Sequence, residues 1–160
     1  MAEIAILRQV RESQERERYR QSISRWNTGE KASLMLGRAL VGGYFLYNGI
    51  NHFRNKGMLS SYAASKGVPY PDAAVAGSGA MLLLGGLSLL TGVRPKLGAS
   101  LISGFLLGVT PQMHNFWNVT DGQQRMGEQV NFLKNIGLLG GMLMAAAIRE
   151  PWPVSLPTTR

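Results

Sequence analysis

Hydrophobic residues gather in four blocks that short polar segments separate. Two stretches, residues 73–93 and 97–120, contain no acidic or basic side chain. As a helix the first would be about 31 Å long, at ~1.5 Å per residue, which matches the ~30 Å hydrocarbon core of a bilayer. A small water-soluble domain rarely has two uncharged stretches of this length. The pattern therefore predicts an integral membrane protein.

The ends of these blocks indicate an all-α fold. Pro71 precedes the second block, where we expect Asp72 to cap a helix. Pro111 is expected to kink or end the third helix near residue 110, and Pro151 and Pro153 follow the fourth block. We predict an integral membrane four-helix bundle in residues 32–149. Its helices are expected at about residues 32–53, 73–93, 97–117 and 130–148.

The first 31 residues are unusually charged and contain twelve of the 26 acidic and basic side chains. Glu12 and Arg16 have the i, i+4 spacing that stabilises helices. Apolar side chains recur every three or four residues and form a narrow seam: Ile4, Leu7, Val10, Tyr19, Ile23 and Trp26. We expect a cytoplasmic amphipathic helix docked on a partner or on the membrane, with a solvated tail as the alternative. Residues 150–160 are expected to form a Pro-rich cytoplasmic tail.

The formal net charge of +8 fits a membrane protein better than a nucleic-acid-binding one, because acidic residues alternate with the N-terminal basic ones. With both termini in the cytoplasm, eleven Lys and Arg residues lie inside and four outside, as the positive-inside rule requires. Trp26 and Trp152 are then expected at the inner interface and Trp117 at the outer one. Arg38, near the inner end of the first helix, is expected to extend its side chain toward the interface.

Glycine is frequent, at 20 of 160 residues. Apolar helices in lipid have no hydrophobic reason to associate, so small residues that allow close backbone approach favour packing. Small side chains recur at helical spacing in each predicted span. We expect the following positions to pack the bundle: Ala39, Gly43, Gly77, Gly104, Gly108, Gly137 and Gly141.

Polar side chains concentrate at the predicted outer end of the bundle. A quinone head group needs hydrogen-bond donors in an apolar, aromatic-lined pocket, and Asn, His and Lys supply such donors. Ligation of haem or chlorophyll by His52 or His114 is a weaker alternative, and capping of helix ends in headgroup water is the simplest one. The candidate residues for a quinone or lipid, with Arg38 from the inner end, are Arg38, Asn48, Asn51, His52, His114, Trp117, Lys134 and Asn135.

Motifs of soluble enzymes are missing from the sequence. The chain has no cysteine, which excludes a disulfide framework, a thiolate metal site and a cysteine nucleophile. Asp72, Asp121 and Glu128 look like isolated loop acids, so no metal cluster is expected. The predicted spans contain no acidic residue, which argues against a carboxylate proton relay. These observations assign no catalytic residue and leave enzymatic activity open.

Several short motifs together resemble the DoxX family. They are Gly-Arg-Ala-Leu at 37–40, Asn-Gly-Ile-Asn-His-Phe at 48–53, Gly-Gly at 85–86, His-Asn-Phe-Trp at 114–117, and Phe-Leu-Lys-Asn at 132–135 before Gly-Gly at 140–141. The resemblance covers about residues 33–148 and implies a four-helix membrane protein of the bacterial inner membrane. Some members of the family are linked to thiosulfate:quinone oxidoreduction or to membrane-bound redox complexes. The resemblance points to five residues to test: Arg38, His114, Trp117, Lys134 and Asn135.

Two functions follow from this interpretation. The first is a non-catalytic accessory subunit of a larger membrane complex that handles electrons, with other membrane subunits and lipids as partners. The charged arm and the tail, which the resemblance does not cover, would hold those partners. The second is a quinone-reactive redox protein that uses the outer His, Lys and Asn residues. Transport has little support, because the sequence shows no inverted repeat.

Overall fold

The computed structural model describes residues 2–156, except for the side chains at positions 2, 15, 19, 22 and 23. In this part of the chain there are six α-helices, one 3₁₀-helix and no β-strand, so the expected all-α fold is confirmed. In chain order the elements are α1 (Ala2–Ser24), α2 (Thr28–Arg54), α3 (Lys56–Ser65), α4 (Pro71–Thr91), α5 (Pro95–Met113), η1 (Phe116–Asn118) and α6 (Gly122–Ala147).

Side-chain caps set the starts of α2 and α6. Asn27 begins α2 with a capping box, in which its side chain accepts a hydrogen bond from the Glu30 amide and its own amide donates to the Glu30 carboxylate. Asp121 caps α6 by accepting from the Gln124 amide at 2.7 Å. The expectation for Asp72 was wrong, because Tyr70 is the N-cap of α4 and Asp72 lies in its first turn.

Several helix boundaries differ from those expected. Helix α3 was not predicted, because its ten residues are too few for a clear pattern. Helix α5 continues past Pro111 to Met113. Helix α6 begins at Gly122, eight residues before the predicted start, because the polar residues of its first two turns hide the apolar pattern.

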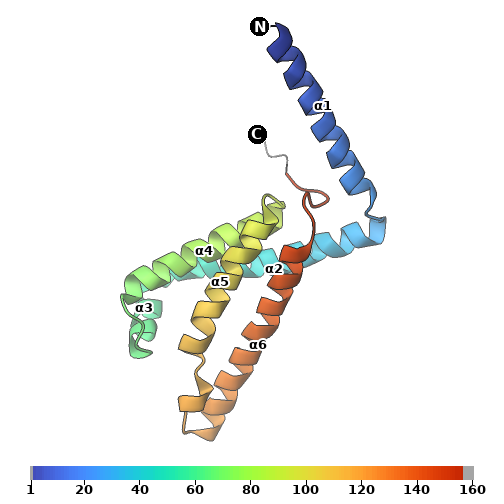
Figure 1. Ribbon diagram of the computed structural model, residues 1–160. Coiled ribbons are helices and arrows are strands. Elements are labelled where there is room, and N and C mark those ends of the chain that lie inside the picture. Colours follow the sequence, from blue (N-terminus) through green and yellow to red (C-terminus); the bar gives the residue numbers. More distant parts are fainter. Residues whose placement is uncertain (1, 157–160) are drawn as a thin grey trace.

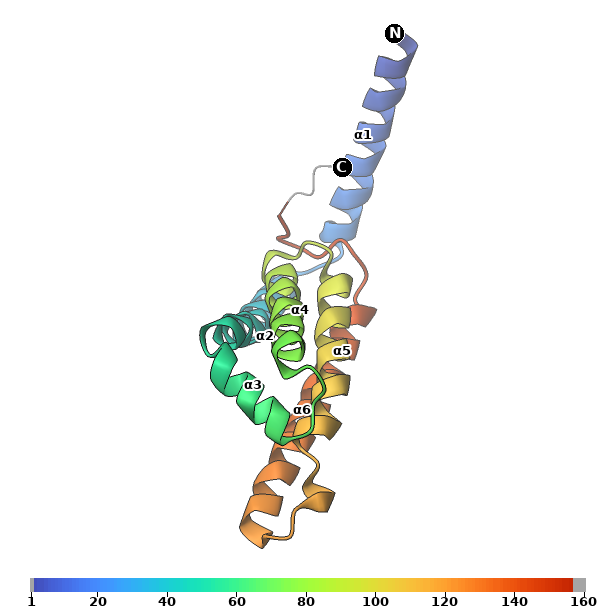
Figure 2. The same cartoon turned by 90° about the vertical axis from the view of Figure 1, so that its left-hand side faces the viewer.

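Helix α1 stands away from the other helices (Figures 1 and 2). The seam residues Ile4, Leu7 and Val10 are exposed, so no described part of this chain covers them. The side chains of Tyr19 and Ile23 lie outside the described residues. The structure therefore contains the expected helix, and its docking remains a prediction.

The remaining long helices form a series of neighbours. Helix α2 packs along α4, α4 along α5, and α5 along α6. The α2–α4 pair and the α5–α6 pair diverge from the turn that joins α4 to α5 (Figure 1). Helix α6 contacts mainly α5 and η1, so the compact four-helix bundle is not confirmed. The largest buried core side chains belong to all four of these helices and to the tail: Phe45, Leu82, Ile102, Leu106, Met142 and Trp152.

Glycines bring the helices together, although not those expected. A Cβ on Gly86 would lie 2.6 Å from the Leu46 amide nitrogen and 2.8 Å from the Gly42 carbonyl oxygen, so only glycine fits there. The other glycines in tight contact between helices are Gly42, Gly49, Gly79, Gly85 and Gly98.

Most of the predicted packing positions do not face another helix of this chain. A Cβ at Gly43, Gly77, Gly108, Gly137 or Gly141 would meet nothing within 4 Å. Gly104 has a single neighbour, the Met81 methyl group at 3.3 Å, and Ala39 is exposed. The expectation was wrong within the chain because adjacent residues such as Gly42 and Gly43 point about 100° apart around a helix.

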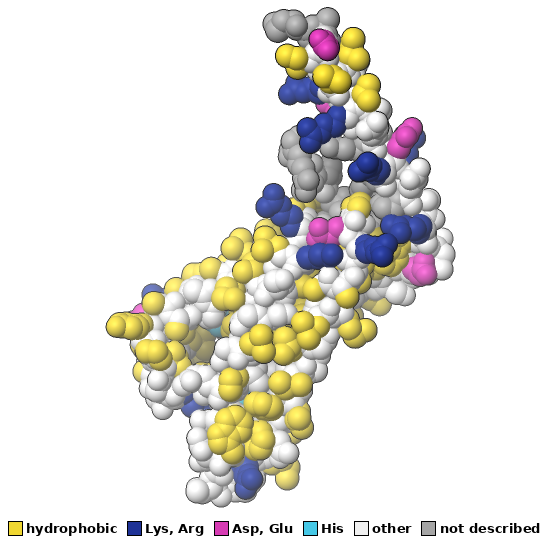
Figure 3. Space-filling model, viewed as in Figure 1, with side chains coloured by type: hydrophobic (Ala, Val, Ile, Leu, Met, Phe, Trp, Pro, Cys, Tyr) yellow, Lys and Arg dark blue, Asp and Glu magenta, His cyan; other side chains and the backbone are white. Residues whose placement is uncertain are grey.

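Apolar side chains cover the outside of these helices. Helices α4 and α6 are long and apolar enough to cross a bilayer, judged by length and composition. Large apolar residues are also exposed on α2 and α5, including Leu36, Leu40 and Leu107. Figure 3 shows apolar side chains over α4, α5 and α6, and charged ones gathered where α1 meets the other helices. An apolar surface of this extent fits a membrane protein.

Candidate functional site

A cavity of about 150 Å³ lies between α2, α5 and α6, where the two helix pairs diverge. Four of the eight predicted ligand-binding residues line it: Asn48, His114, Lys134 and Asn135. Tyr44 and Phe45 from α2, Phe105, Leu106 and Val109 from α5, and Leu138 from α6 complete the wall. The structure therefore brings together polar groups from the last turns of α2, from the residue after α5 and from the middle of α6, in an aromatic and aliphatic setting.

The polar groups at this cavity are mainly hydrogen-bond donors. Lys134 Nζ donates to the Asn131 side-chain oxygen at 3.0 Å and keeps two further N–H groups. The Asn48 side-chain nitrogen Nδ2 donates to the Tyr44 carbonyl oxygen at 2.8 Å. Asn135 is only 8% exposed and lies in the wall beside Lys134. Such a set suits a ligand with carbonyl oxygens and an apolar ring.

His114 belongs to an ionic group with Glu128 and Lys66. Its ring Nδ1 lies 2.7 Å from Glu128 Oε2, and Lys66 Nζ lies 3.3 Å from Glu128 Oε1. Gln112 Nε2 donates to the Lys66 carbonyl oxygen at 2.9 Å. These contacts tie the end of α3 to the end of α5 and to α6. The contact between Glu128 and His114 Nδ1 also fixes the orientation of the His114 ring.

Sequence reasoning missed Glu128. It appeared to be an isolated loop acid, and this was wrong, because it lies on α6 with a side chain that is only 12% exposed. One sequence signal was available. Glu128 precedes Asn135 by seven residues, two helical turns, so both share a face once the helix is known to start at Gly122.

Three other predicted residues lie outside the cavity wall. The ring Nδ1 of His52 is 2.7 Å from the Asn48 carbonyl oxygen. The Asn51 side-chain oxygen Oδ1 accepts a hydrogen bond from the Asn55 side-chain nitrogen Nδ2 at 2.6 Å. Trp117 on η1 is 51% exposed and packs edge-on against Phe116 and Phe132.

The two histidines therefore have different surroundings. Within residues 2–156, no group of three or more His, Cys, Asp or Glu side chains is arranged to hold a metal ion.

Arg38 is far from this cavity. It is 7% exposed and donates to the Leu89, Leu90 and Pro153 carbonyl oxygens at 2.8 to 2.9 Å. Those contacts lie at the end of α4 that adjoins the start of α5, whereas His114 follows the other end of α5, about 28 Å away along its 19 residues. The expectation that Arg38 extends to the interface was wrong, because these carbonyl groups satisfy it inside the protein.

Trp152 is buried among the helices, and its expected place at the inner interface remains a prediction. It is 1% exposed, and the Arg38 guanidinium lies 5.9 Å from the centre of its ring. The described tail thus folds back onto the helices. A hydrogen bond from the Leu156 amide to the Thr91 carbonyl oxygen, at 3.0 Å, continues this contact.

Comparison with known proteins adds one match. The family model DoxX matches residues 33–115, slightly more than half of the chain. No curated protein and no solved structure matches it. The matched region runs from α2 to the residue after His114 and excludes α1, α6 and the tail, so it is shorter than the resemblance noted in the sequence. Because it includes the helices that carry Arg38, Asn48 and His114, and confirms that resemblance, the chain belongs to the DoxX family.

Proposed function

We propose that this protein is a non-catalytic accessory subunit of a larger electron-transfer complex in the bacterial inner membrane. In this proposal α2, α4, α5 and α6 cross the bilayer, both termini are cytoplasmic, and α1 contacts a neighbouring subunit. The proposal accounts for the many large apolar side chains that these helices expose.

The outward face of α6 carries this proposal. It exposes Leu133, Ile136 and Met144, the last at 74%. Between them lie Gly137, Gly140 and Gly141, where a Cβ would meet nothing within 4 Å. A face of small residues bordered by apolar ones allows the backbone of another transmembrane helix to approach closely. Contact with lipid chains does not require such a face.

Photo-crosslinking in native membranes tests this assignment. A photoreactive residue at Gly140 should crosslink to another membrane subunit, and the full tagged chain should co-purify with that subunit in mild detergent. The control position is Leu107, an exposed residue on α5, which should react mainly with lipid. A chain that purifies alone, with position 140 crosslinked only to lipid, contradicts the proposal.

The cavity beside His114 favours a second candidate function, a quinone-reactive redox protein. Its aromatic wall suits a quinone ring, and Lys134 and His114 lie where they can donate to a quinone carbonyl oxygen. The side chains described here would bind and orient the head group. The electrons would come from thiosulfate oxidation or from a neighbouring subunit.

Quinone binding and thiosulfate-dependent quinone reduction by the isolated protein test this second candidate. The variants His114→Ala and Lys134→Ala should each weaken quinone binding about tenfold, as expected for loss of a hydrogen bond to a charged group. The matched controls are His52→Ala and Lys56→Ala, which lie outside the cavity wall. Equal quinone binding by all four variants contradicts this second candidate function.

A further inference from the structure

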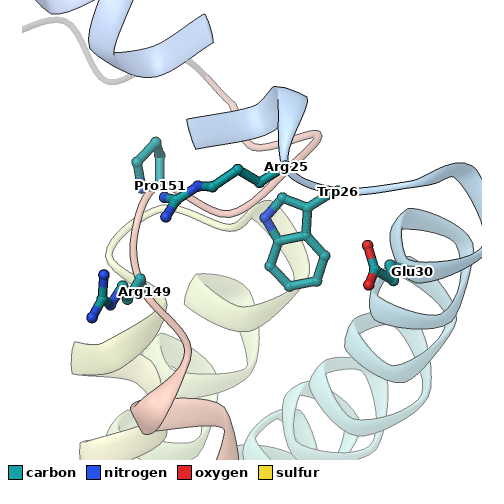
Figure 4. Close-up of a pocket in the computed structure, with 5 residues that line it drawn as sticks. All are labelled: Arg25, Trp26, Glu30, Arg149 and Pro151. Atoms are coloured by element: carbon teal, nitrogen blue, oxygen red, sulfur yellow. The ribbon is translucent and has the colours of Figure 1, made fainter. Parts of the chain in front are cut away.

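A second and larger cavity, of about 250 Å³, lies where the start of α2 meets the segment after α6. Arg25, Trp26 and Glu30 line it from the α1–α2 junction, and Arg149 and Pro151 line it from the tail. Figure 4 shows the Arg25 side chain extending toward Pro151, with Glu30 on the far side of Trp26. Two arginines that are 124 residues apart in sequence thus border one cavity.

The side chains that line this cavity carry a net positive charge, with two arginines and one glutamate. Neither Arg25 nor Arg149 forms an ion pair among residues 2–156. Glu30 also lines the cavity, where it accepts from the Asn27 amide at 2.8 Å and contributes one negative charge against the two arginines. Glu150 lies outside the wall and accepts from the Lys96 amide at 3.1 Å. The cavity therefore presents two guanidinium groups that are available to an anion.

The position of the cavity indicates which anion would reach it. Helix α2 begins at Thr28 and α6 ends at Ala147, so two long helices end beside the cavity, whereas α4 ends ten residues further along α2, where Leu90 meets Arg38. The phosphate groups of lipids lie just beyond such ends in a membrane protein. Trp26, which is half-buried in the cavity wall, is a residue type that concentrates at that depth.

We propose that this cavity binds the phosphate group of an anionic phospholipid between Arg25 and Arg149. The guanidinium groups donate to phosphate oxygens, for which their planar geometry is well suited. Trp26 packs against the glycerol and upper acyl region. Because Arg25 follows α1 directly and Arg149 follows α6, a bound lipid joins the base of the arm to the tail.

Native mass spectrometry of the full-length protein released from detergent tests the proposal. Phosphatidylglycerol should remain bound in preference to phosphatidylcholine at equal concentration. The double variant R25Q/R149Q should reduce this preference about 25-fold, since each surface cation contributes roughly 1 kcal/mol, or about fivefold, to binding an anionic headgroup. The variant R25K/R149K keeps the charge and should retain most of the preference.

The control R94Q/K96Q removes two basic residues from the same end of the molecule but outside the cavity wall. It should keep the wild-type preference. Equal losses in R25Q/R149Q and R94Q/K96Q would show a general charge effect and overturn the site.

A second arm uses glycerol 1-phosphate, which has the phosphate group without acyl chains. If it displaces phosphatidylglycerol at equal concentration, the ligand is a free phosphate compound and the lipid assignment fails. Circular dichroism of each variant confirms that the helices are intact.

Discussion

The guanidinium Nη1 of Arg38 donates a hydrogen bond of 2.9 Å to the carbonyl oxygen of Pro153, 115 residues further along the chain. The same side chain binds the Leu89 and Leu90 carbonyl oxygens at the end of α4, where a helix leaves its last carbonyl groups without partners. A cation is favoured at this position because the end of a helix carries partial negative charge. One side chain therefore joins α2, α4 and the tail.

Replacing Arg38 should release the tail. Arg38→Met leaves buried carbonyl groups unsatisfied and should lower the free energy of unfolding by about 3 kcal/mol. Thermal unfolding in detergent measures this, and limited proteolysis should show faster cleavage near Trp152. The control Arg54→Met, at an exposed position at the end of α2, should change little.

Arg38→Lys should not restore stability, because one ammonium group cannot reproduce the planar set of donors. A Met variant as stable as the wild type would show that the Arg38 contacts do not hold the tail.

The contact between α2 and α4 should depend on which glycine is changed. Gly86→Ala places a methyl group 2.6 Å from the Leu46 nitrogen, so the helices must separate at a cost of about 1–3 kcal/mol. Gly77→Ala, on the same helix but facing open space, should be neutral or slightly stabilising, because alanine favours helix. Unfolding in detergent distinguishes the two, and equal effects would contradict the described packing.

The ionic group of Lys66, His114 and Glu128 should hold α3 and α6 together. Glu128→Gln removes the charge that pairs with both Lys66 and His114 and should destabilise the protein by about 1–2 kcal/mol. Hydrogen exchange should also become faster in α3. Glu12→Gln, at an exposed position on α1, is the matched control. If the two variants unfold at the same temperature, the contacts of Glu128 are not structural.

Much of the helical framework could be predicted from the sequence, because uncharged blocks of membrane length are direct signals of helices. The convergence of Asn48, His114 and Lys134 could also be anticipated, since successive antiparallel helices bring alternate ends together. The choice between Gly42 and Gly43 could not, because it depends on how two helices cross. The partners of Arg38 could not be predicted either, since they are carbonyl groups that every residue carries.

Short helices and their contacts also could not be predicted from the sequence. Helix α3 is too short to show a period, and its last turn leads to Lys66, which then pairs with an acid 62 residues away. Glu128 was misassigned because the polar start of α6 reads as a loop. The pairing of Lys66 with Glu128 was missed for a further reason, because polar contacts between distant segments leave no local pattern.

The central claim is that four helices cross the bilayer and leave α1 and the α4–α5 turn on the same side. The chain has no cysteine, so single cysteines at Ser13, Lys96, Ser61 and Gln123 give unambiguous labels. In sealed inner-membrane vesicles, an impermeant thiol reagent should label positions 13 and 96 from the cytoplasmic face and positions 61 and 123 only from the opposite face. Labelling of 13 and 96 from opposite faces, or of all four from one face, would contradict the account.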